Sequence, residues 1–154
     1  MTNLKAKEYL KQAYRLDQRI NSNIKEVGEL RAMAGSISSP QLSADKVQTS
    51  HNGDAPFERA LVRIWEMEAK IDAEIDLYVD LKNQIREVIS QIDNVDEQMV
   101  LRYRYIHNKT WEQIGMELFV DKSTVKRWHD TALTHVVVPE NPILISQLDE
   151  NEPL

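Results

Sequence analysis

Two long segments with almost no glycine or proline restrict the fold of this chain more than any other feature. The whole sequence of 154 residues contains only four glycines. In residues 3–34 and 57–92, apolar side chains recur every three or four positions, which is the period of an amphipathic helix. Each helix would be roughly 50 Å long. Neither can bury its apolar stripe alone, so the pattern predicts an all-α protein whose long helices form an antiparallel coiled-coil hairpin or pair with another chain.

The segment between the two helices is rich in residues that interrupt helices. Residues 35–56 combine proline and glycine with serine and asparagine, which predicts a long mobile connection. Three regions follow from the pattern. They are a helical hairpin in residues 1–92, a helix-turn-helix in residues 93–135 and an acidic tail in residues 136–154.

Charge patterning suggests how the two long helices align. Basic residues recur every fourth position on the first helix, and acidic residues do so on the second. Like charges at this spacing disfavour an isolated helix, and an opposing ladder would offset that cost. We therefore predict that the ladders face each other; two independently solvated faces are the alternative. The basic ladder is Lys7, Lys11, Arg15 and Arg19, the acidic ladder is Glu68, Asp72, Asp76 and Asp80, and the predicted pairs are Lys11 with Asp80, Arg15 with Asp76 and Arg19 with Asp72.

Composition excludes several kinds of site. Cysteine is absent, which removes disulfides, thiolate metal sites and thiol nucleophiles. No stretch approaches the ~20 apolar residues of a membrane span, and the N-terminus lacks a secretory pattern. We expect a cytoplasmic protein with no membrane partner. The histidines have no metal-ligand spacing and there is no glycine-rich phosphate loop, so we expect no metal, no cofactor and no enzyme activity.

Capping signals divide the C-terminal third of the chain into short helices. Asn94, Thr110 and Asp121 are each placed to cap the N-terminus of a helix. Gln113 completes a capping-box pattern with Thr110. Gly115 lies where we expect a second helix to pass closely. A short helix, a three-residue turn and a capped final helix together are typical of a helix-turn-helix.

The final predicted helix carries basic and hydroxyl side chains at its N-terminus. In a helix-turn-helix this turn enters the major groove, where such side chains bond bases and phosphates. Although the chain carries a net charge of −6, residues 101–135 hold six basic and four acidic side chains, and local charge governs docking on DNA. The predicted DNA-binding residues are Lys122, Ser123, Thr124, Lys126 and Arg127 on this helix, with Arg102, Arg104, Lys109 and Thr110 in the flanking part of the unit.

Residues 101–133, LRYRYIHNKTWEQIGMELFVDKSTVKRWHDTAL, resemble region 4 of bacterial sigma factors. That region follows roughly the pattern R-x-x-Y, then T-x-x-E-I-A-x-x-L-G-x-S-x-x-T-V-x-R, then A-L. With the early segment AKEYLKQAYRLDQRI, the chain resembles small regulators from phages and prophages of low-GC Gram-positive bacteria, and the resemblance spans most of residues 4–135.

The resemblance implies a role in phage transcription, including late-gene control, in the host bacterial cytoplasm. It matches Lys122 to Arg127 with the DNA-contacting helix and puts Asp121 in place of the capping serine. Two positions depart from the pattern. Phe119 stands where glycine is usual, so we expect a looser turn, and Trp128 replaces a second arginine, so we expect it to pack rather than to contact DNA.

These patterns predict a sequence-specific regulator that binds double-stranded DNA, contacts host RNA polymerase and forms a homo-oligomer through its hairpin. The alternative is a structural or adaptor protein, such as a polymerase-binding or DNA-packaging component, that reads no bases. For the tail, we expect residues 136–138 and 143–145 to dock as strands or onto the hairpin, or else to be disordered. Competition between the acidic tail and DNA for the basic face is a further hypothesis.

Overall fold

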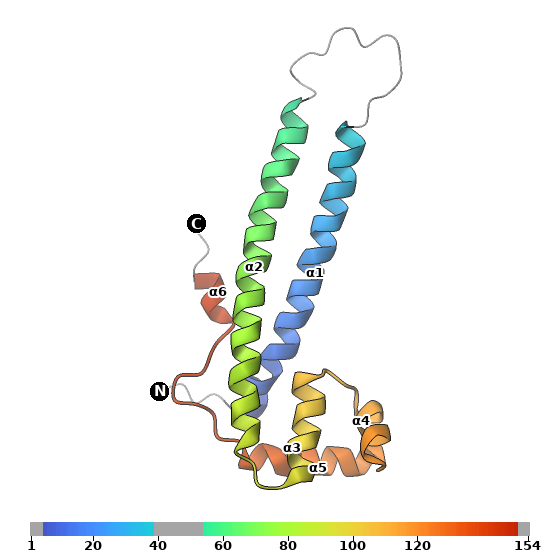
Figure 1. The fold of residues 1–154 in the computed structure, drawn as a ribbon, viewed down its shortest axis with the longest axis vertical. Coiled ribbons are helices and arrows are strands. Elements are labelled where there is room, and N and C mark those ends of the chain that lie inside the picture. The colour runs from blue at the N-terminus through green and yellow to red at the C-terminus, as the bar shows by residue number, and fades with distance from the viewer. Residues whose placement is uncertain (1–4, 39–53, 151–154) are drawn as a thin grey trace. The chain divides into compact units, whose positions relative to one another are not determined.

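The computed structural model describes residues 5–38 and 54–150, and within these ranges it is helical and contains no strand (Figure 1). The predicted all-α fold is confirmed. The two long helices are α1 (Ala6–Ser38) and α2 (Asp54–Ser90). They are followed by α3 (Val95–Leu101), the π-helix η1 (Arg102–Ile106), α4 (Trp111–Leu118), α5 (Lys122–His135) and α6 (Ser146–Glu150).

The connection between the long helices is shorter than the sequence predicted. Helix α1 continues to Ser38, and α2 already begins at Asp54. Pro56 lies in the first turn of α2, where a backbone N–H has no helical partner to lose, so it does not delay the helix. The rest of the predicted connection, residues 39–53, lies outside the described residues. No described helix is long and apolar enough to span a bilayer.

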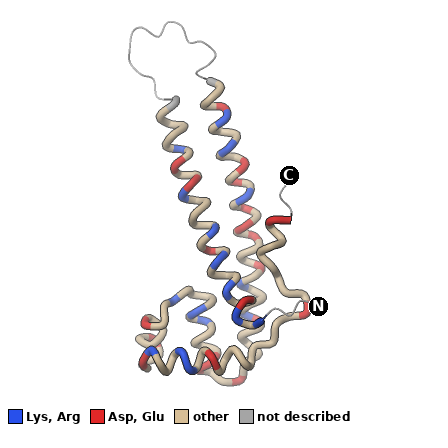
Figure 2. The backbone as a smooth tube through the Cα atoms, turned by 180° about the vertical axis from the view of Figure 1, so that it is seen from behind, with Lys and Arg blue, Asp and Glu red and all other residues tan. Residues whose placement is uncertain are grey.

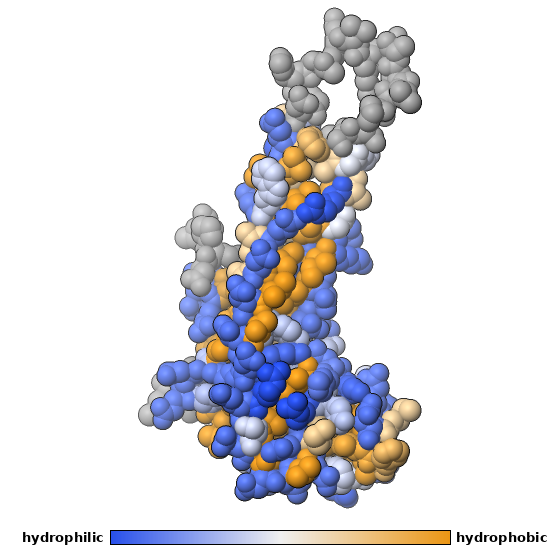
Figure 3. All heavy atoms as spheres, in the orientation of Figure 1, coloured by the Kyte–Doolittle hydropathy of each residue, from blue (hydrophilic) through white to orange (hydrophobic). Residues whose placement is uncertain are grey.

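The chain divides into two compact units. One contains residues 19–75, and the other contains residues 1–18 together with 76–154. In the first unit the facing parts of α1 and α2 bury a cluster that includes Val27, Ile64 and Ile71. Several apolar side chains of this unit remain on the surface, which Figure 3 shows as orange patches along the long helices. Trp65 of α2 is 60% exposed.

The ion pairs of the first unit differ from the predicted ones. Arg19 Nε lies 2.6 Å from Oε2 of Glu74, which is fully buried, and the Asn23 amide donates to the other carboxylate oxygen. Arg31 pairs with Glu68 near the surface. The predicted pairing of Arg19 with Asp72 is therefore wrong, because Asp72 lies on the exposed side of α2 while Glu74 faces α1.

The other two predicted pairs are also wrong. Among the described residues no ion pair joins Lys11 to Asp80 or Arg15 to Asp76. Both aspartates are exposed on α2, so most of the acidic ladder is a solvated face. This is the alternative that the sequence left open. Among the described residues, the basic residues at positions 7, 11 and 15 of α1 have no acidic partner. Figure 2 shows how basic and acidic positions are distributed along the backbone.

In the second unit, the N-terminal part of α1 packs with the C-terminal part of α2. Leu10, Leu16 and Leu81 are fully buried, and the hydroxyl of Tyr9 donates to Gln84 Oε1 at 2.6 Å. Helices α3 and α4 both pack against α5. Their shared core is Val100, Ile114 and Val125, with partly buried Tyr103, Trp111, Leu118, Val120 and Trp128 around it.

Two glutamines fix the tail on the long helices. Gln12 donates to the Ile143 carbonyl at 3.0 Å and accepts from the Ile145 amide at 3.1 Å. Gln84 accepts from the Ile143 amide at 2.9 Å and donates to the Asn141 carbonyl at 3.2 Å. Docking of residues 143–145 onto the hairpin is thus confirmed, and the described residues of the tail form no strand. These bonds give no support to competition between the tail and DNA.

The two arginine pairs of the first unit offer a matched test of the register. Arg19→Met leaves a buried carboxylate without its guanidinium, so we expect the free energy of unfolding to fall by about 1–3 kcal/mol. Arg31→Met removes an exposed pair and should cost less than about 1 kcal/mol. Urea unfolding followed by circular dichroism measures both. Equal losses in the two variants would contradict the register.

Candidate nucleic-acid interface

The N-terminus of α5 is capped as the sequence predicted. Asp121 precedes the helix with extended backbone angles and accepts from the Thr124 amide at 3.3 Å. The Ser123 hydroxyl donates to Asp121 Oδ2 at 2.8 Å, and the Thr124 hydroxyl donates to Oδ1. These side-chain bonds, from Thr124 first and Ser123 second, lower the pKa of Asp121. Both hydroxyls that were predicted to contact DNA are therefore held by the cap.

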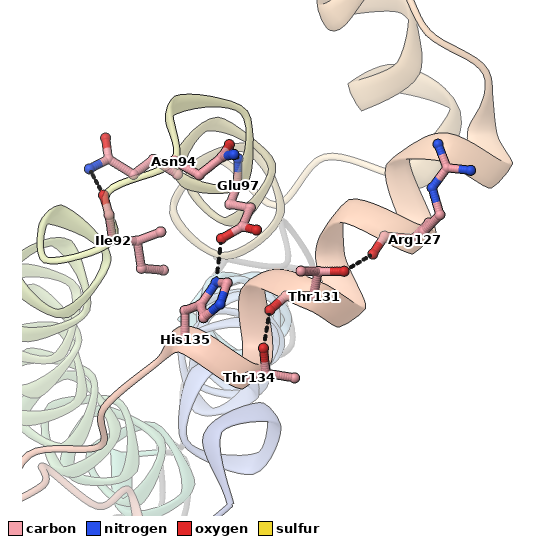
Figure 4. Close-up of polar contacts among 8 residues, drawn as sticks. Ile92, Asn94, Glu97, Arg127, Thr131, Thr134 and His135 are labelled. Atoms are coloured by element: carbon pink, nitrogen blue, oxygen red, sulfur yellow. Dashed lines mark hydrogen bonds and ion pairs between the residues drawn. The ribbon is translucent and has the colours of Figure 1, made fainter.

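Basic side chains lie together on the exposed face of α5. Lys122, Lys126 and Arg127 are exposed, and the opposite side of the helix buries Val125 and His129. Figure 4 shows the Arg127 side chain extending from α5. Lys126 and Arg127 have no carboxylate partner within the described part of the chain. The structure thus brings the predicted recognition residues onto one surface.

The Lys122 side chain forms an ion pair with a residue of α4. Its ammonium lies 2.6 Å from Glu112 Oε1, and both side chains are exposed. The hydrogen bond from Lys122 is the main reason why the pKa of Glu112 is lowered. A phosphate at this edge of the face would have to compete with the Glu112 carboxylate, so Lys126 and Arg127 are the cations more readily offered to a ligand.

A close backbone approach orients α5 relative to α4. A Cβ atom at Gly115 would lie 2.7 Å from the carbonyl oxygen of Val120 and 3.7 Å from a methyl group of Val125. The predicted close contact at Gly115 is confirmed, although its nearest neighbour is the turn. Phe119 ends α4 at φ 57° and ψ 41° and is 94% exposed. Phe119 thus adopts the left-handed conformation that glycine usually supplies.

The other end of α5 is attached to α3. His135 Nδ1 lies 2.7 Å from Oε2 of Glu97, which is nearly buried, as Figure 4 shows. Glu97 belongs to the first turn of α3, where Asn94 accepts from its amide at 3.1 Å, as its predicted capping role requires. Within α5, the Thr131 hydroxyl donates to the Arg127 carbonyl. The helix is therefore held at both ends.

Beneath α5 lies a buried polar contact. The Tyr105 hydroxyl and His129 Nε2 are 2.6 Å apart, and Trp111 approaches the His129 ring edge-on at 4.7 Å between centroids. Burial lowers the pKa of His129 and raises that of Tyr105 to about 12. The imidazole is therefore neutral near pH 7. With its proton on Nδ1, which faces Asp130 Oδ1 at 3.4 Å, Nε2 accepts from the Tyr105 hydroxyl.

The other four predicted DNA-binding residues belong to η1 and to the segment that precedes α4. Arg104 stacks over Trp111 at 4.2 Å and donates to the Lys109 carbonyl at 3.0 Å. Lys109 pairs with Glu117 at 2.8 Å, and Thr110 forms the predicted capping box with Gln113. Arg102 is half-buried in η1. Trp128 packs around the core of the unit, as expected.

Sequence reasoning missed one group of candidate residues. Arg104 and Thr110 line a cavity together with Lys7, Lys11 and Arg15 of α1. The basic ladder was the available signal, but it was assigned to the acidic ladder of α2. No group of three or more potential metal-ligating side chains occurs in the ranges that the structure describes.

These features define an all-α protein in which the short helices α4 and α5 are joined by a three-residue turn. The chain belongs to DUF722, a family described as protein of unknown function, which it matches over residues 8–136. The match runs from the first turn of α1 to just beyond α5, so it includes the long helices and the helix-turn-helix. No curated protein and no solved structure matches the chain significantly.

Gly115→Ala tests the approach of α4 to the turn. The added methyl group would collide with the Val120 carbonyl, which is backbone and cannot easily move, so we expect a loss of about 1–3 kcal/mol in the free energy of unfolding. Gly28→Ala is the control, because nothing lies within 4 Å of that position in α1. It should raise stability by about 0.5–1 kcal/mol. Thermal unfolding of both variants distinguishes the two effects; a harmless Gly115→Ala would contradict the packing.

His129 should make stability depend on pH. Its folded-state pKa is lowered, so the unfolded chain takes up the proton first as pH falls. The stability that neutral His129 contributes is complete above the unfolded-state pKa of about 6.5. This stability is lost as the pH falls below that value. His129→Gln still accepts from Tyr105 but does not titrate. We expect unfolding measurements at about pH 7.5 and 5.5 to show a larger acid loss in the wild type than in the variant.

Proposed function

We propose that this protein is a transcriptional regulator that binds double-stranded DNA in a sequence-specific manner through α5. The observation that carries the proposal is the exposed placement of Lys126 and Arg127 near the N-terminus of a capped helix. A helix presented in this way fits the major groove, where basic side chains reach guanine and phosphate oxygens. The resemblance to sigma region 4 supports promoter DNA as the target and phage or prophage genes as the regulated set.

Different parts of α5 would contribute different contacts. Arg127 and Lys126 would reach base edges or phosphates, while the N-terminus of the helix favours a phosphate through its partial positive charge. Ser123 and Thr124 would contact DNA only by leaving Asp121 or by sharing their hydroxyls with it. The chain carries a net charge of −6, which disfavours tight non-specific binding and makes base contacts more important.

Self-association through the long helices is part of the same proposal. Ile24, Val62 and Trp65 are large apolar side chains on the surface of the residue 19–75 unit. Apolar surface of this kind favours pairing with a second helical surface. A dimer would present two copies of α5 to two half-sites, as in many helix-turn-helix proteins.

A second candidate is an adaptor that acts through protein contacts without reading bases. Phe119 is 94% exposed and Met116 is 77% exposed at the C-terminal end of α4. Two large apolar side chains beside a DNA-reading helix suit a protein partner, such as RNA polymerase. A polymerase contact is compatible with DNA binding, so only the loss of base readout separates this candidate from the first.

Lys126→Ala with Arg127→Ala should reduce binding to a promoter fragment by about 10-fold or more and should lower the slope of log affinity against log salt by up to about 2. Fluorescence anisotropy with labelled phage and host promoter fragments measures both quantities. Lys25→Ala with Arg63→Ala is the matched control, because it removes two exposed cations from the other unit.

The control should bind DNA as the wild type does. Circular dichroism verifies that both double variants fold. Wild-type protein that ignores promoter DNA yet captures RNA polymerase would overturn base readout and favour the adaptor.

A further inference from the structure

A cavity lies between the N-terminal part of α1 and the segment from η1 to α4. Its volume is about 490 Å³, which is within the range of small-molecule sites. All of its lining residues belong to the unit that contains α5, but none belongs to α5 itself. They are Lys7, Lys11, Tyr14, Arg15 and Gln18 from α1, with Arg104, Tyr105, Asn108, Thr110 and Trp111 from the C-terminal part.

Four of the lining residues are cations and none is a carboxylate. Lys7, Lys11 and Arg15 occupy successive turns of α1, about 6 Å apart along the helix axis. Among the described residues none of these three has an acidic partner within ion-pair distance. Like charges on one helix face repel one another when no opposite charge is nearby. Their combined positive potential attracts anions. The spacing is close to that of successive phosphates along a nucleic-acid strand.

Aromatic rings lie beside these cations. Tyr14 is 46% exposed, and the Gln18 amide donates to its hydroxyl at 2.8 Å, which restrains the ring. Trp111 carries the Arg104 guanidinium on its ring at 4.2 Å. A planar ring that enters the cavity therefore meets an aromatic surface next to positive charge, which is the combination that binds unpaired bases.

We propose that this cavity binds a nucleotide. Lys7, Lys11 and Arg15 would hold phosphate, and Tyr14 would stack on the base. The ligand would be either a free nucleotide or one unit of an unpaired strand. A base pair in a duplex is already stacked and its edge is engaged, so it does not fit this chemistry. The site is independent of the proposed recognition by α5.

The test uses the full chain and two probes, which are a labelled single-stranded oligodeoxythymidine of about 12 nucleotides and free dTTP. Lys11→Ala with Arg15→Ala should weaken strand binding by about 10-fold and lower its salt slope by about 1.4. Lys25→Ala with Arg63→Ala, the exposed pair outside this unit, should leave binding unchanged. If dTTP also binds and displaces the strand, the ligand is a free nucleotide; if it does not, the ligand is a strand.

A second substitution tests the base contact. Tyr14→Ala should weaken binding several-fold, while Tyr14→Phe, which keeps the ring, should bind as the wild type does. No binding of either probe, or equal binding by the two double variants, would overturn the proposal. So would a full loss of binding in Lys11→Ala with Arg15→Ala but none in Tyr14→Ala, because phosphate contacts alone would then suffice. Promoter-duplex binding measured in parallel reports on α5 separately.

Discussion

The contact between Gly115 and the Val120 carbonyl is the constraint on which the rest of the helix-turn-helix depends. A Cβ atom added at Gly115 would lie only 2.7 Å from that oxygen, so α4 approaches its own turn as closely as the backbone permits. Phe119 must then turn left-handed, and the chain reaches Asp121 in an extended conformation that caps α5. The exposure of Lys126 and Arg127 follows from this geometry, because Val125 is directed into the core.

Sequence predicted the helix beginnings well because they are decided locally. Asn94, Thr110 and Asp121 each bond an amide within three residues, so no distant part of the chain is needed to place them. Register is different, because it depends on which side of each long helix is buried. The acidic ladder was regular but exposed, whereas Glu74, which is off the ladder by half a turn, faces Arg19.

The candidate sites likewise include one part that sequence could predict, the basic face of α5, and one that it could not, the cavity. The basic face of α5 follows from one helix and its cap, so its residues were predicted together. The cavity depends on α1 meeting η1 and α4, which brings Lys11 and Arg104 to one surface across about ninety positions of sequence. No spacing rule connects such residues. The glutamines that hold the tail, Gln12 and Gln84, are likewise uncharged and carry no periodic signal.

The attachment of the tail bears on the charge of the cavity. An acidic segment within the same unit is an obvious counter-charge for unpaired lysines and arginines. Its described residues are instead fixed by four neutral hydrogen bonds to Gln12 and Gln84. Among the residues that the structure describes, Lys7, Lys11 and Arg15 have no carboxylate partner. The hydrogen bonds that hold residues 141–145 thus use none of the cations of the cavity, which stay available to a ligand from outside the chain.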